Sequence, residues 1–230
     1  MIRYTAIVLA AGSGKRMESD TPKQYMQLRG KPLMLYCLEA FEASCVEEII
    51  IVVAPGEIEY VKKNIVERYG LHKVSYIVEG GAERYDSVEA AINVARGEFV
   101  LIHDSARPMI TADIINRCAS GVAIYDSCVV GMPSKDTIKL TDERGRVLST
   151  PDRNNAWIVQ TPQCFKISII KEAFAKFRAS KDSDITDDAM IVERYMGLPV
   201  RMLKASYTNM KVTTPEDFII ANAILGSASN

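Results

Sequence analysis

The sequence has little of what many metal and disulfide sites require. Its 230 residues include only two histidines, at positions 72 and 103, which excludes a cluster of histidine metal ligands. The five cysteines stand at positions 37, 45, 118, 128 and 164. Their number is odd, they are widely separated, and they form no Cys-x-x-Cys pair, so a disulfide framework or a zinc site is disfavoured. We expect most of them to be buried as small hydrophobic side chains.

The chain also lacks an excess of charge of one sign. Its net charge is −1, which gives no general attraction to nucleic acid or to an anionic membrane surface. There is no apolar run long enough to span a membrane, and the N-terminus carries no signal-peptide pattern. We therefore expect neither nucleic acid nor membrane as a partner, and a cytoplasmic location. With 48% hydrophobic residues, the chain is predicted to form a single α/β domain over residues 1–230.

The N-terminal segment indicates a phosphate-binding loop. A short apolar run, residues 6–11, breaks at Gly12-Ser13-Gly14-Lys15-Arg16-Met17 and is followed by Pro22-Lys23-Gln24. Such a run is typical of a buried strand that enters a tight loop, where backbone N–H groups are open to an anion. Lys15, Arg16 and Lys23 can neutralise phosphate charge. Alone, the Gly-x-Gly pattern is equally compatible with a surface turn whose charges are solvated.

Two common phosphate motifs are incomplete here. The Walker pattern is disfavoured because Leu9 occupies the place of its first glycine and Arg16 follows Gly14-Lys15. The dinucleotide fingerprint is disfavoured because Met17 occupies the place of its third glycine. A P-loop NTPase and a dinucleotide-dependent oxidoreductase are therefore both disfavoured.

Further along the chain, apolar runs alternate with helical patterns. We predict strands at 49–54, 74–78 and 99–103, and helices at 57–69 and 87–95. Strands separated by helices imply a doubly wound, mostly parallel sheet. Ligands bind such sheets beyond the carboxyl ends of the strands, where the glycine loop, Gly80-Gly81 and Asp104 are all expected.

The stretch 133–157 departs from this pattern. Residues 137–140 and 146–150 alternate apolar and polar side chains, and residues 142–145 supply turn residues between them. This predicts a solvent-facing β-hairpin arm. Because a lone two-stranded arm is barely stable in water, we expect it to pack against a second copy of the chain.

The N-terminal stretch, read as Leu-Ala-Ala-Gly-x-Gly-x-Arg-Met followed by Pro-Lys-Gln, resembles the nucleotidyltransferases that join a nucleoside triphosphate to a sugar or polyol phosphate. Among them, the chain is similar to the 2-C-methyl-D-erythritol 4-phosphate cytidylyltransferase family of the non-mevalonate isoprenoid pathway. The resemblance continues in ordered blocks at 80–88, 103–108, 152–154 with Trp157, 160–163, 186–189 and 209–217.

The resemblance implies a Rossmann-like nucleotidyltransferase fold whose β-arm interlocks two subunits. It implies transfer of a cytidylyl group from CTP to 2-C-methyl-D-erythritol 4-phosphate, giving 4-diphosphocytidyl-2-C-methyl-D-erythritol and pyrophosphate. The attacking phosphate is already an anion, so cations rather than a strong base are the expected machinery. The resemblance implies that Arg16 and Lys23 stabilise the transition state. It also implies that Lys211 and Arg153 position the acceptor, and that Arg153 does so in the site of the partner subunit. For Lys23 and Lys211 the alternative is an ordinary solvated lysine.

The remaining expected ligand-binding residues follow the same blocks. The loop 80–87 should read cytosine through backbone carbonyls and the Ser87 hydroxyl. Ala82 stands where this family often has aspartate, and Glu83 and Arg84 are expected to form a solvated pair. Thr186 should assist as a hydroxyl donor. The full set of predicted binding residues is Ala10, Ala11, Gly12, Ser13, Gly14, Lys15, Gly80, Gly81, Ala82, Ser87, Asp104, Ser105, Arg107, Thr161 and Thr186.

Asp104 and His103 each have two interpretations. Asp104 can accept a hydrogen bond from an acceptor hydroxyl or help to hold Mg²⁺, or it can cap the next helix. His103 can act as a base or, as we favour, orient the loop at the end of its strand. Mg²⁺, or another divalent cation, is implied by the triphosphate, which brings its own ligands.

Two other functions remain open. Ribitol 5-phosphate cytidylyltransferases share the phosphate loop, but their first strand usually enters it as Ala-Gly-Gly. Two features favour the methylerythritol phosphate family instead: the sequence Ala10-Ala11-Gly12, and Arg153-Asn154 with Trp157. A non-enzymatic nucleotide-binding module would tolerate loss of Lys23 or Lys211, and both are present.

Overall fold

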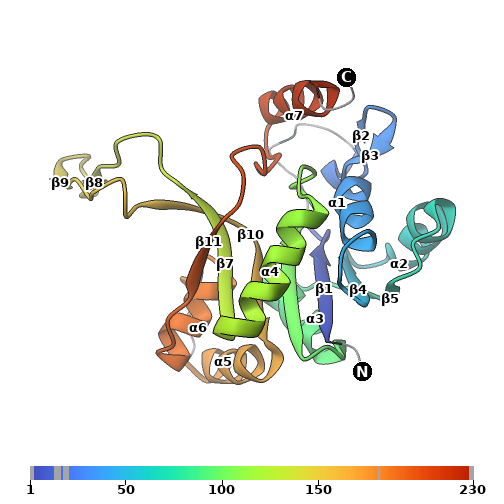
Figure 1. Cartoon of the computed structure of the whole chain (residues 1–230), viewed down its shortest axis with the longest axis horizontal. Helices are drawn as coiled ribbons and strands as arrows, with labels where there is room; N and C mark the ends of the chain where they lie inside the picture. The colour runs from blue at the N-terminus through green and yellow to red at the C-terminus, as the bar shows by residue number, and fades with distance from the viewer. Residues whose placement is uncertain (1–2, 13–16, 18–20, 181, 228–230) are drawn as a thin grey trace.

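The computed structural model describes residues 3–12, 17, 21–180 and 182–227 (Figure 1). Within these residues, seven strands form one sheet in the order β11-β7-β10-β6-β1-β4-β5. The strands of this sheet are β1 (Tyr4–Leu9), β4 (Glu48–Val53), β5 (Val74–Glu79), β6 (Phe99–Asp104), β7 (Ser127–Pro133), β10 (Trp157–Lys166) and β11 (Arg201–Lys204). The helices are η2 (Lys23–Tyr25), α1 (Leu33–Glu42), α2 (Ile58–Val61), η3 (Lys62–Glu67), α3 (Arg84–Val94), α4 (Ala112–Tyr125), α5 (Ile167–Ser180), α6 (Asp188–Met196) and α7 (Pro215–Ser227).

The sheet is mostly parallel, which confirms the predicted fold class. β1 pairs in parallel with β4 and β6, β4 with β5, and β7 with β11. β10 is antiparallel to both of its neighbours, β6 and β7. The sequence pattern did not indicate this reversal. It arises because β10 follows β7 through the arm, without the crossover helix that a parallel pair needs.

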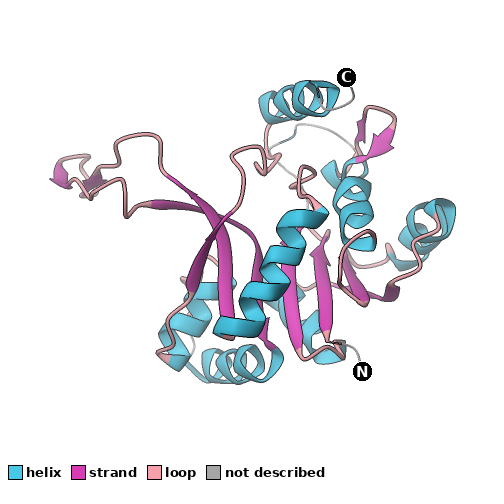
Figure 2. Ribbon diagram, in the orientation of Figure 1, coloured by secondary structure: helices cyan, strands magenta, loops and turns pink. Residues whose placement is uncertain are grey.

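Helices cover both faces of the sheet (Figure 2). Buried side chains of α1 and α4 pack on one face, against Ala6 and Val8 of β1. Side chains of α3, α5 and α6 pack on the other face, against Ile7. Successive side chains of β1 therefore point alternately into two hydrophobic cores, as a doubly wound fold requires.

The predicted elements are all present, with shifted ends. β1 ends at Leu9, so Ala10 and Ala11 belong to the loop. α3 begins three residues before the predicted start, because the Glu83 and Asp86 side chains form a capping box at its N-terminus. The helix predicted over 57–69 is α2 followed by a π-helical stretch, η3.

The arm occupies the chain between β7 and β10, close to the predicted 133–157 (Figure 1). Its strands are shorter than predicted: β8 (Leu140–Thr141) pairs antiparallel with β9 (Val147–Ser149). Asp142 organises the turn, accepting hydrogen bonds from the Arg144 and Arg146 backbone N–H groups. Apolar side chains on the arm and its root are exposed, namely Leu140, Val147, Leu148, Ile158 and Val159.

A third, smaller hydrophobic cluster lies beneath α7. It contains Met17, Leu28, Leu33, Met109, Val212 and Ala221. The cluster joins the N-terminal loop region, the small hairpin β2 (Gln27–Leu28) and β3 (Lys31–Pro32), and the segment that leads into α7. It thereby places Lys211, next to Val212, over the carboxyl end of the sheet.

All five cysteines are free thiols. Cys37, Cys118, Cys128 and Cys164 are buried, as predicted for most of them, and Cys45 is exposed. Burial raises the pKa of the Cys37 thiol to about 12, so it is unreactive at neutral pH. In the part of the chain that the structure describes, no helix is long and apolar enough to cross a membrane.

Candidate active site

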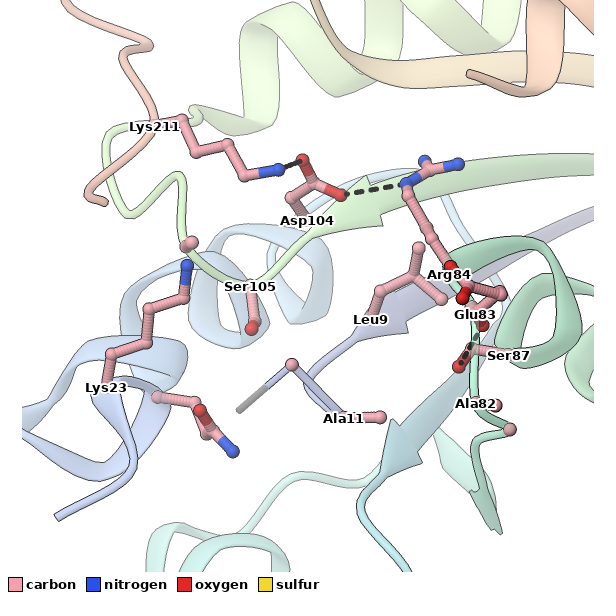
Figure 3. Close-up of a pocket in the computed structure, with 14 residues that line it drawn as sticks. Leu9, Ala11, Lys23, Ala82, Glu83, Arg84, Ser87, Asp104, Ser105 and Lys211 are labelled. Carbon is pink, nitrogen blue, oxygen red and sulfur yellow. Dashed lines mark hydrogen bonds and ion pairs between the residues drawn. The ribbon is translucent and has the colours of Figure 1, made fainter. Parts of the chain in front are cut away.

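A cavity of about 350 Å³ opens at the carboxyl ends of β1 and β6, where the sequence predicted the ligand site (Figure 3). Ala11 and Gly12, at the start of the glycine loop, line the cavity together with the turn before α3, and Lys23 and Lys211 line it as well. The cavity is lined by Leu9, Ala11, Gly12, Lys23, Gln24, Gly81, Ala82, Glu83, Arg84, Ser87, Asp104, Ser105, Ala106 and Lys211.

The described start of the phosphate loop is held by backbone hydrogen bonds to its neighbours. The Ala10 N–H donates to the Val52 carbonyl at 2.7 Å, and the Ser105 N–H donates to the Leu9 carbonyl at 3.0 Å. A Cβ atom on Gly12 would meet no atom of the described residues within 4 Å. The backbone at Gly12 therefore faces open space, in which a phosphate can approach. Ser13, Gly14, Lys15 and Arg16 lie outside the described residues.

Close packing explains the glycine pair before α3. A Cβ atom on Gly80 would lie 2.5 Å from the Ser87 Oγ and 2.7 Å from the Ala11 Cβ. A Cβ atom on Gly81 would lie 2.3 Å from the Asp86 Cβ. Only glycine lets this turn pack directly on the phosphate loop. The predicted Gly80, Gly81, Ala82 and Ser87 are thus brought beside Ala11 and Gly12.

Asp104 ends β6 among three cations. Its carboxylate lies 2.8 Å from the Lys211 Nζ, 3.6 Å from the Arg84 Nε and 4.0 Å from the Arg107 Nε. Burial alone would raise the pKa of this carboxyl, but the charges of Arg84 and Lys211 outweigh burial and hold the pKa well below its usual range. Asp104 is therefore ionised. The helix-cap interpretation is wrong, because the next helix, α4, is capped by Thr111.

A second cavity of about 310 Å³ lies on the other side of Asp104. It is lined by Arg84, Asp104, Arg107, Val159, Gln160, Thr161, Gln163, Thr186, Asp187 and Lys211. It shares Arg84, Asp104 and Lys211 with the first cavity. The predicted Arg107, Thr161 and Thr186 are thus brought together, separated from the phosphate loop by a wall of three charged side chains.

Lys23 and Lys211 are joined through the segment before α7. The Lys23 Nζ donates to the Val212 carbonyl at 3.4 Å, and the Val212 N–H donates to the Ala106 carbonyl at 2.7 Å. Both lysines line the first cavity (Figure 3). Their placement in the cavity wall argues against the interpretation as ordinary solvated surface lysines.

His103 is a buried structural residue, as favoured from the sequence. The Thr161 hydroxyl donates to the His103 Nδ1 at 3.0 Å and accepts from the Asp104 N–H at 3.1 Å. The Nε2–H of His103 donates to the Arg107 carbonyl at 3.2 Å. Burial lowers the pKa of His103 to about 4, so the ring stays neutral at physiological pH. It orients the loop that carries Asp104 and Arg107.

The predicted solvated pair of Glu83 and Arg84 is wrong. Glu83 takes part in the capping box of α3, whereas the Arg84 guanidinium forms two hydrogen bonds of 2.8 Å to the buried carboxylate of Asp188. Sequence reasoning missed Asp188 as well. The only signal was its place in the block 186–189, because residues 104 positions apart show no pattern along the chain.

Two buried amides, also missed from the sequence, hold the Lys211 segment. The Asn209 Nδ2 donates to the Gln160 Oε1 and to the Thr161 carbonyl, at 3.1 and 3.0 Å. The Arg107 Nη1 donates to the Asn209 carbonyl at 2.8 Å. Among the described residues, the buried Arg107 Nε has no hydrogen-bond partner, and Arg107 lines the second cavity. This orphaned donor is a candidate contact for an anion.

Arg153 lies apart from these cavities. It is an exposed residue between the arm and β10, and it lines neither cavity of its own chain. Among the described residues, no group of three or more histidine, cysteine, aspartate or glutamate side chains could hold a metal ion. Asp104 already faces three cations, so its surroundings disfavour a further divalent cation as a direct partner.

A doubly wound sheet with a glycine loop at the end of its first strand, beside a cavity walled by cations, is the architecture of nucleotidyltransferase-like α/β proteins. The family model for IspD, 2-C-methyl-D-erythritol 4-phosphate cytidylyltransferase, matches residues 4–227. The chain belongs to this family.

Individual relatives agree with the family model. The chain is 50% identical to the 2-C-methyl-D-erythritol 4-phosphate cytidylyltransferase of Lachnoclostridium phytofermentans, covering 98% of this chain and 97% of the relative. It is 49% identical to the enzyme of the same name from Lachnospira eligens, covering 96% and 98%. The crystal structure of the 4-diphosphocytidyl-2C-methyl-D-erythritol synthase of Anaerococcus prevotii superposes with a TM-score of 0.87 at 30% identity, covering 98% and 96%.

Proposed function

We propose that this protein transfers a cytidylyl group from CTP to 2-C-methyl-D-erythritol 4-phosphate, producing 4-diphosphocytidyl-2-C-methyl-D-erythritol and pyrophosphate. One observation carries the proposal: two adjacent cavities share a wall made of Arg84, Asp104 and Lys211. A reaction between two anionic substrates needs two sites that meet at cations, and this wall provides that meeting place.

In this proposal, CTP occupies the first cavity. Its base lies against the 80–87 turn, where backbone carbonyls accept from the exocyclic amine of cytosine and thereby exclude uracil. Its triphosphate lies over the open backbone at Gly12, toward Lys23 and Ser105. Ala82 offers no side-chain contact to the base, so the selection depends on the backbone carbonyls and on the Ser87 hydroxyl.

The acceptor occupies the second cavity. Asp104, held ionised by its neighbours, accepts a hydrogen bond from an acceptor hydroxyl, and Thr186 contributes its own hydroxyl. The orphaned Nε of Arg107 is available to the acceptor phosphate. Thr161 acts indirectly, because its hydroxyl is already engaged by His103 and the Asp104 N–H.

The chemical step is an in-line displacement. An oxygen of the acceptor phosphate forms a bond to the α-phosphorus of CTP while the bond from that phosphorus to the bridging oxygen of the β-phosphate breaks, and pyrophosphate leaves with the electron pair. Lys211, in the shared wall, keeps the two phosphates together against their mutual repulsion. Lys23, with Arg16 of the phosphate loop, stabilises the charge that develops on the pentavalent phosphorus and on the leaving group.

Mg²⁺ accompanies the triphosphate and neutralises its charge when bound. Because three cations surround Asp104, we assign that carboxylate to the acceptor rather than to the metal. Activity should vanish in excess chelator and return on addition of Mg²⁺, while the purified protein should retain no stoichiometric metal by elemental analysis. Full activity in chelator, or bound zinc or iron, would contradict this.

The same proposal includes a cytoplasmic homodimer. The arm exposes Leu140, Val147 and Leu148, and a second copy of the chain is the simplest surface to cover them. Arg153, at the end of the arm, then reaches the acceptor cavity of the partner subunit rather than its own.

The activity can be tested by measuring pyrophosphate release from CTP with methylerythritol phosphate and, separately, with ribitol 5-phosphate. We expect a clear preference for methylerythritol phosphate. A preference for ribitol phosphate would overturn the proposed acceptor. Release with neither acceptor, by a protein that still binds CTP, would instead support a nucleotide-binding module.

A further inference from the structure

Arg84 lines both cavities. It is the first residue of α3, directly after the 80–83 turn that lines the proposed nucleotide cavity. Its side chain extends away from Ala82 toward Asp104 (Figure 3). The position of Arg84 in the chain therefore suggests a contact to the nucleotide, whereas the direction of its side chain suggests a role in the acceptor cavity.

The main partner of Arg84 is Asp188. The Nη1 and Nη2 atoms each donate at 2.8 Å to a different oxygen of this carboxylate, which is only 1% exposed. Burial raises the pKa of Asp188, and the charge of Arg84 opposes that rise. A bidentate guanidinium fixes both the charge and the orientation of a buried carboxylate, which a point charge cannot do.

Asp188 begins α6, two residues after Thr186. Its backbone N–H, like that of Ala189, donates to the Gln163 Oε1 at 3.0 Å, and the Gln163 Nε2 donates to the Asp187 carboxylate at 2.8 Å. The turn that carries Thr186 into the acceptor cavity is thus anchored by Gln163 from β10 and by Arg84 from α3.

Arg84 also faces Asp104. The Arg84 Nε lies 3.6 Å from the Asp104 Oδ1. The Lys211 Nζ lies 2.8 Å from the other oxygen of this carboxylate, Oδ2. Arg84 therefore restrains Asp104, which lines the acceptor cavity at the end of β6, and Asp188, the buried residue directly after the lining residue Asp187.

We propose that Arg84 is a positioning residue for the acceptor, which it aligns through Asp188 and Asp104 despite its place in the nucleotide-binding turn. The inference rests on the proposed function, because it assigns the second cavity to the acceptor. It predicts an asymmetry between the substrates: weakening the Arg84 contacts should reduce affinity for the acceptor much more than affinity for CTP.

The test is steady-state kinetics of Arg84→Lys with each substrate varied in turn. Lysine keeps the charge but cannot form both bonds to Asp188 and still face Asp104. We expect the KM for methylerythritol phosphate to rise about tenfold and the KM for CTP to change less than about threefold. Asp188→Asn should show the same asymmetry, and the double variant should be little worse than either single variant.

Arg178→Lys is the matched control. Arg178 also forms ion pairs with α3, to Asp86 and Glu89, but it lines neither cavity. Both KM values should stay at the parental level in this variant. If Arg84→Lys does not fold by circular dichroism, Asp188→Asn alone carries the test.

Two results would overturn the inference. One is a rise in the KM for CTP at least as large as that for the acceptor, which would make Arg84 a nucleotide contact. The other is that both KM values of Arg84→Lys and of Asp188→Asn equal those of Arg178→Lys. The unmodified protein is assayed first, and failure of that protein to use methylerythritol phosphate would refute the proposed function before any variant is compared.

Discussion

The cavity edge of the sheet and the arm are built in opposite ways. At the cavity edge, Asp104 is buried and surrounded by cations from three separate segments of the chain. In the arm, the described ion pair joins Asp142 to Arg146, four residues along the same turn, and Leu148 is 69% exposed. Contacts between distant segments hold the first region, whereas the second is held by local contacts.

The difference shows which contacts fix the conformation of each region. The charged groups of the site are fixed because the strands and helices that carry them share two large cores. The arm has no core of its own, and isolated surface ion pairs contribute little. Its exposed apolar side chains support the proposed association with a second copy of the chain, whereas the cavities support the proposed chemistry.

Loss of a lysine in the cavity should have the largest effect. We expect Lys23→Ala and Lys211→Ala each to lower kcat by about a hundredfold or more, because each removes a charge aimed at phosphates in the transition state. Rapid-quench or pyrophosphate-release assays measure this, with CTP affinity determined separately. Lys176→Ala, which removes an exposed ion pair with Glu172 and a contact to the Met196 Sδ outside both cavities, should retain parental kcat. A kcat within about threefold of the parent for both cavity variants would remove the lysines from catalysis.

Subunit exchange should reveal whether the arm and the cavity cooperate. Mixing inactive Lys23→Ala with inactive Arg153→Ala gives heterodimers in which one composite site has both defects and the other has none. Random exchange should restore roughly a quarter of the parental activity, because about half of the dimers are mixed and each has one intact site. Labelled subunits confirm the exchange. If exchange occurs and activity stays at the level of the separate variants, Arg153 serves its own subunit.

His103 should make the cavity region sensitive to acid. The pKa of His103 is about 4 in the folded protein, against 6.5 for the unperturbed side chain. The unfolded chain therefore binds a proton first, and stability falls as pH decreases from about 6.5 to 4. We expect a loss of about 3 kcal/mol in the free energy of unfolding across that window. Urea titrations of the parent and of His103→Gln check this, and equal pH slopes for the two proteins would refute it.

The arm should give the smallest effect on unfolding of a single subunit. Replacing Leu148 by serine should change the free energy of unfolding of the isolated subunit by less than about 0.5 kcal/mol, because the side chain is exposed. Leu101→Ala, in fully buried β6, should cost about 2 to 5 kcal/mol. Analytical ultracentrifugation should show that Leu148→Ser weakens the dimer. An unchanged dimer would mean that the arm does not hold the subunits together.

Local patterns predicted much of this molecule. Apolar runs ending at glycine or aspartate located β4, β5 and β6, and the turn residues at 142–145 located the arm. The sequence blocks located Lys211 and Asp104, which the structure places 2.8 Å apart. These features could be predicted from the sequence because each is encoded by a few consecutive residues.

Pairings between distant residues were not accessible. The bond from Arg84 to Asp188 joins residues 104 positions apart. The amide pair of Gln160 and Asn209 involves β10, whose antiparallel direction a sequence of alternating strands and helices does not indicate. A charged residue in a glycine-rich turn is usually solvated, and Arg84 was predicted to be solvated for that reason. The prediction was wrong because Arg84 binds the buried carboxylate of Asp188.

The route of the chain through the site has a consequence for its synthesis. Lys23 lies at the start of η2, whereas its hydrogen-bond partner Val212 is 189 positions later, in the hydrophobic cluster beneath α7. On the ribosome, β1, β4, β5 and β6 emerge long before Lys211. The wall between the two cavities cannot close until the segment leading into α7 has left the exit tunnel. A nascent chain that still lacks this segment therefore lacks Lys211, one of the three charged side chains that the two cavities share.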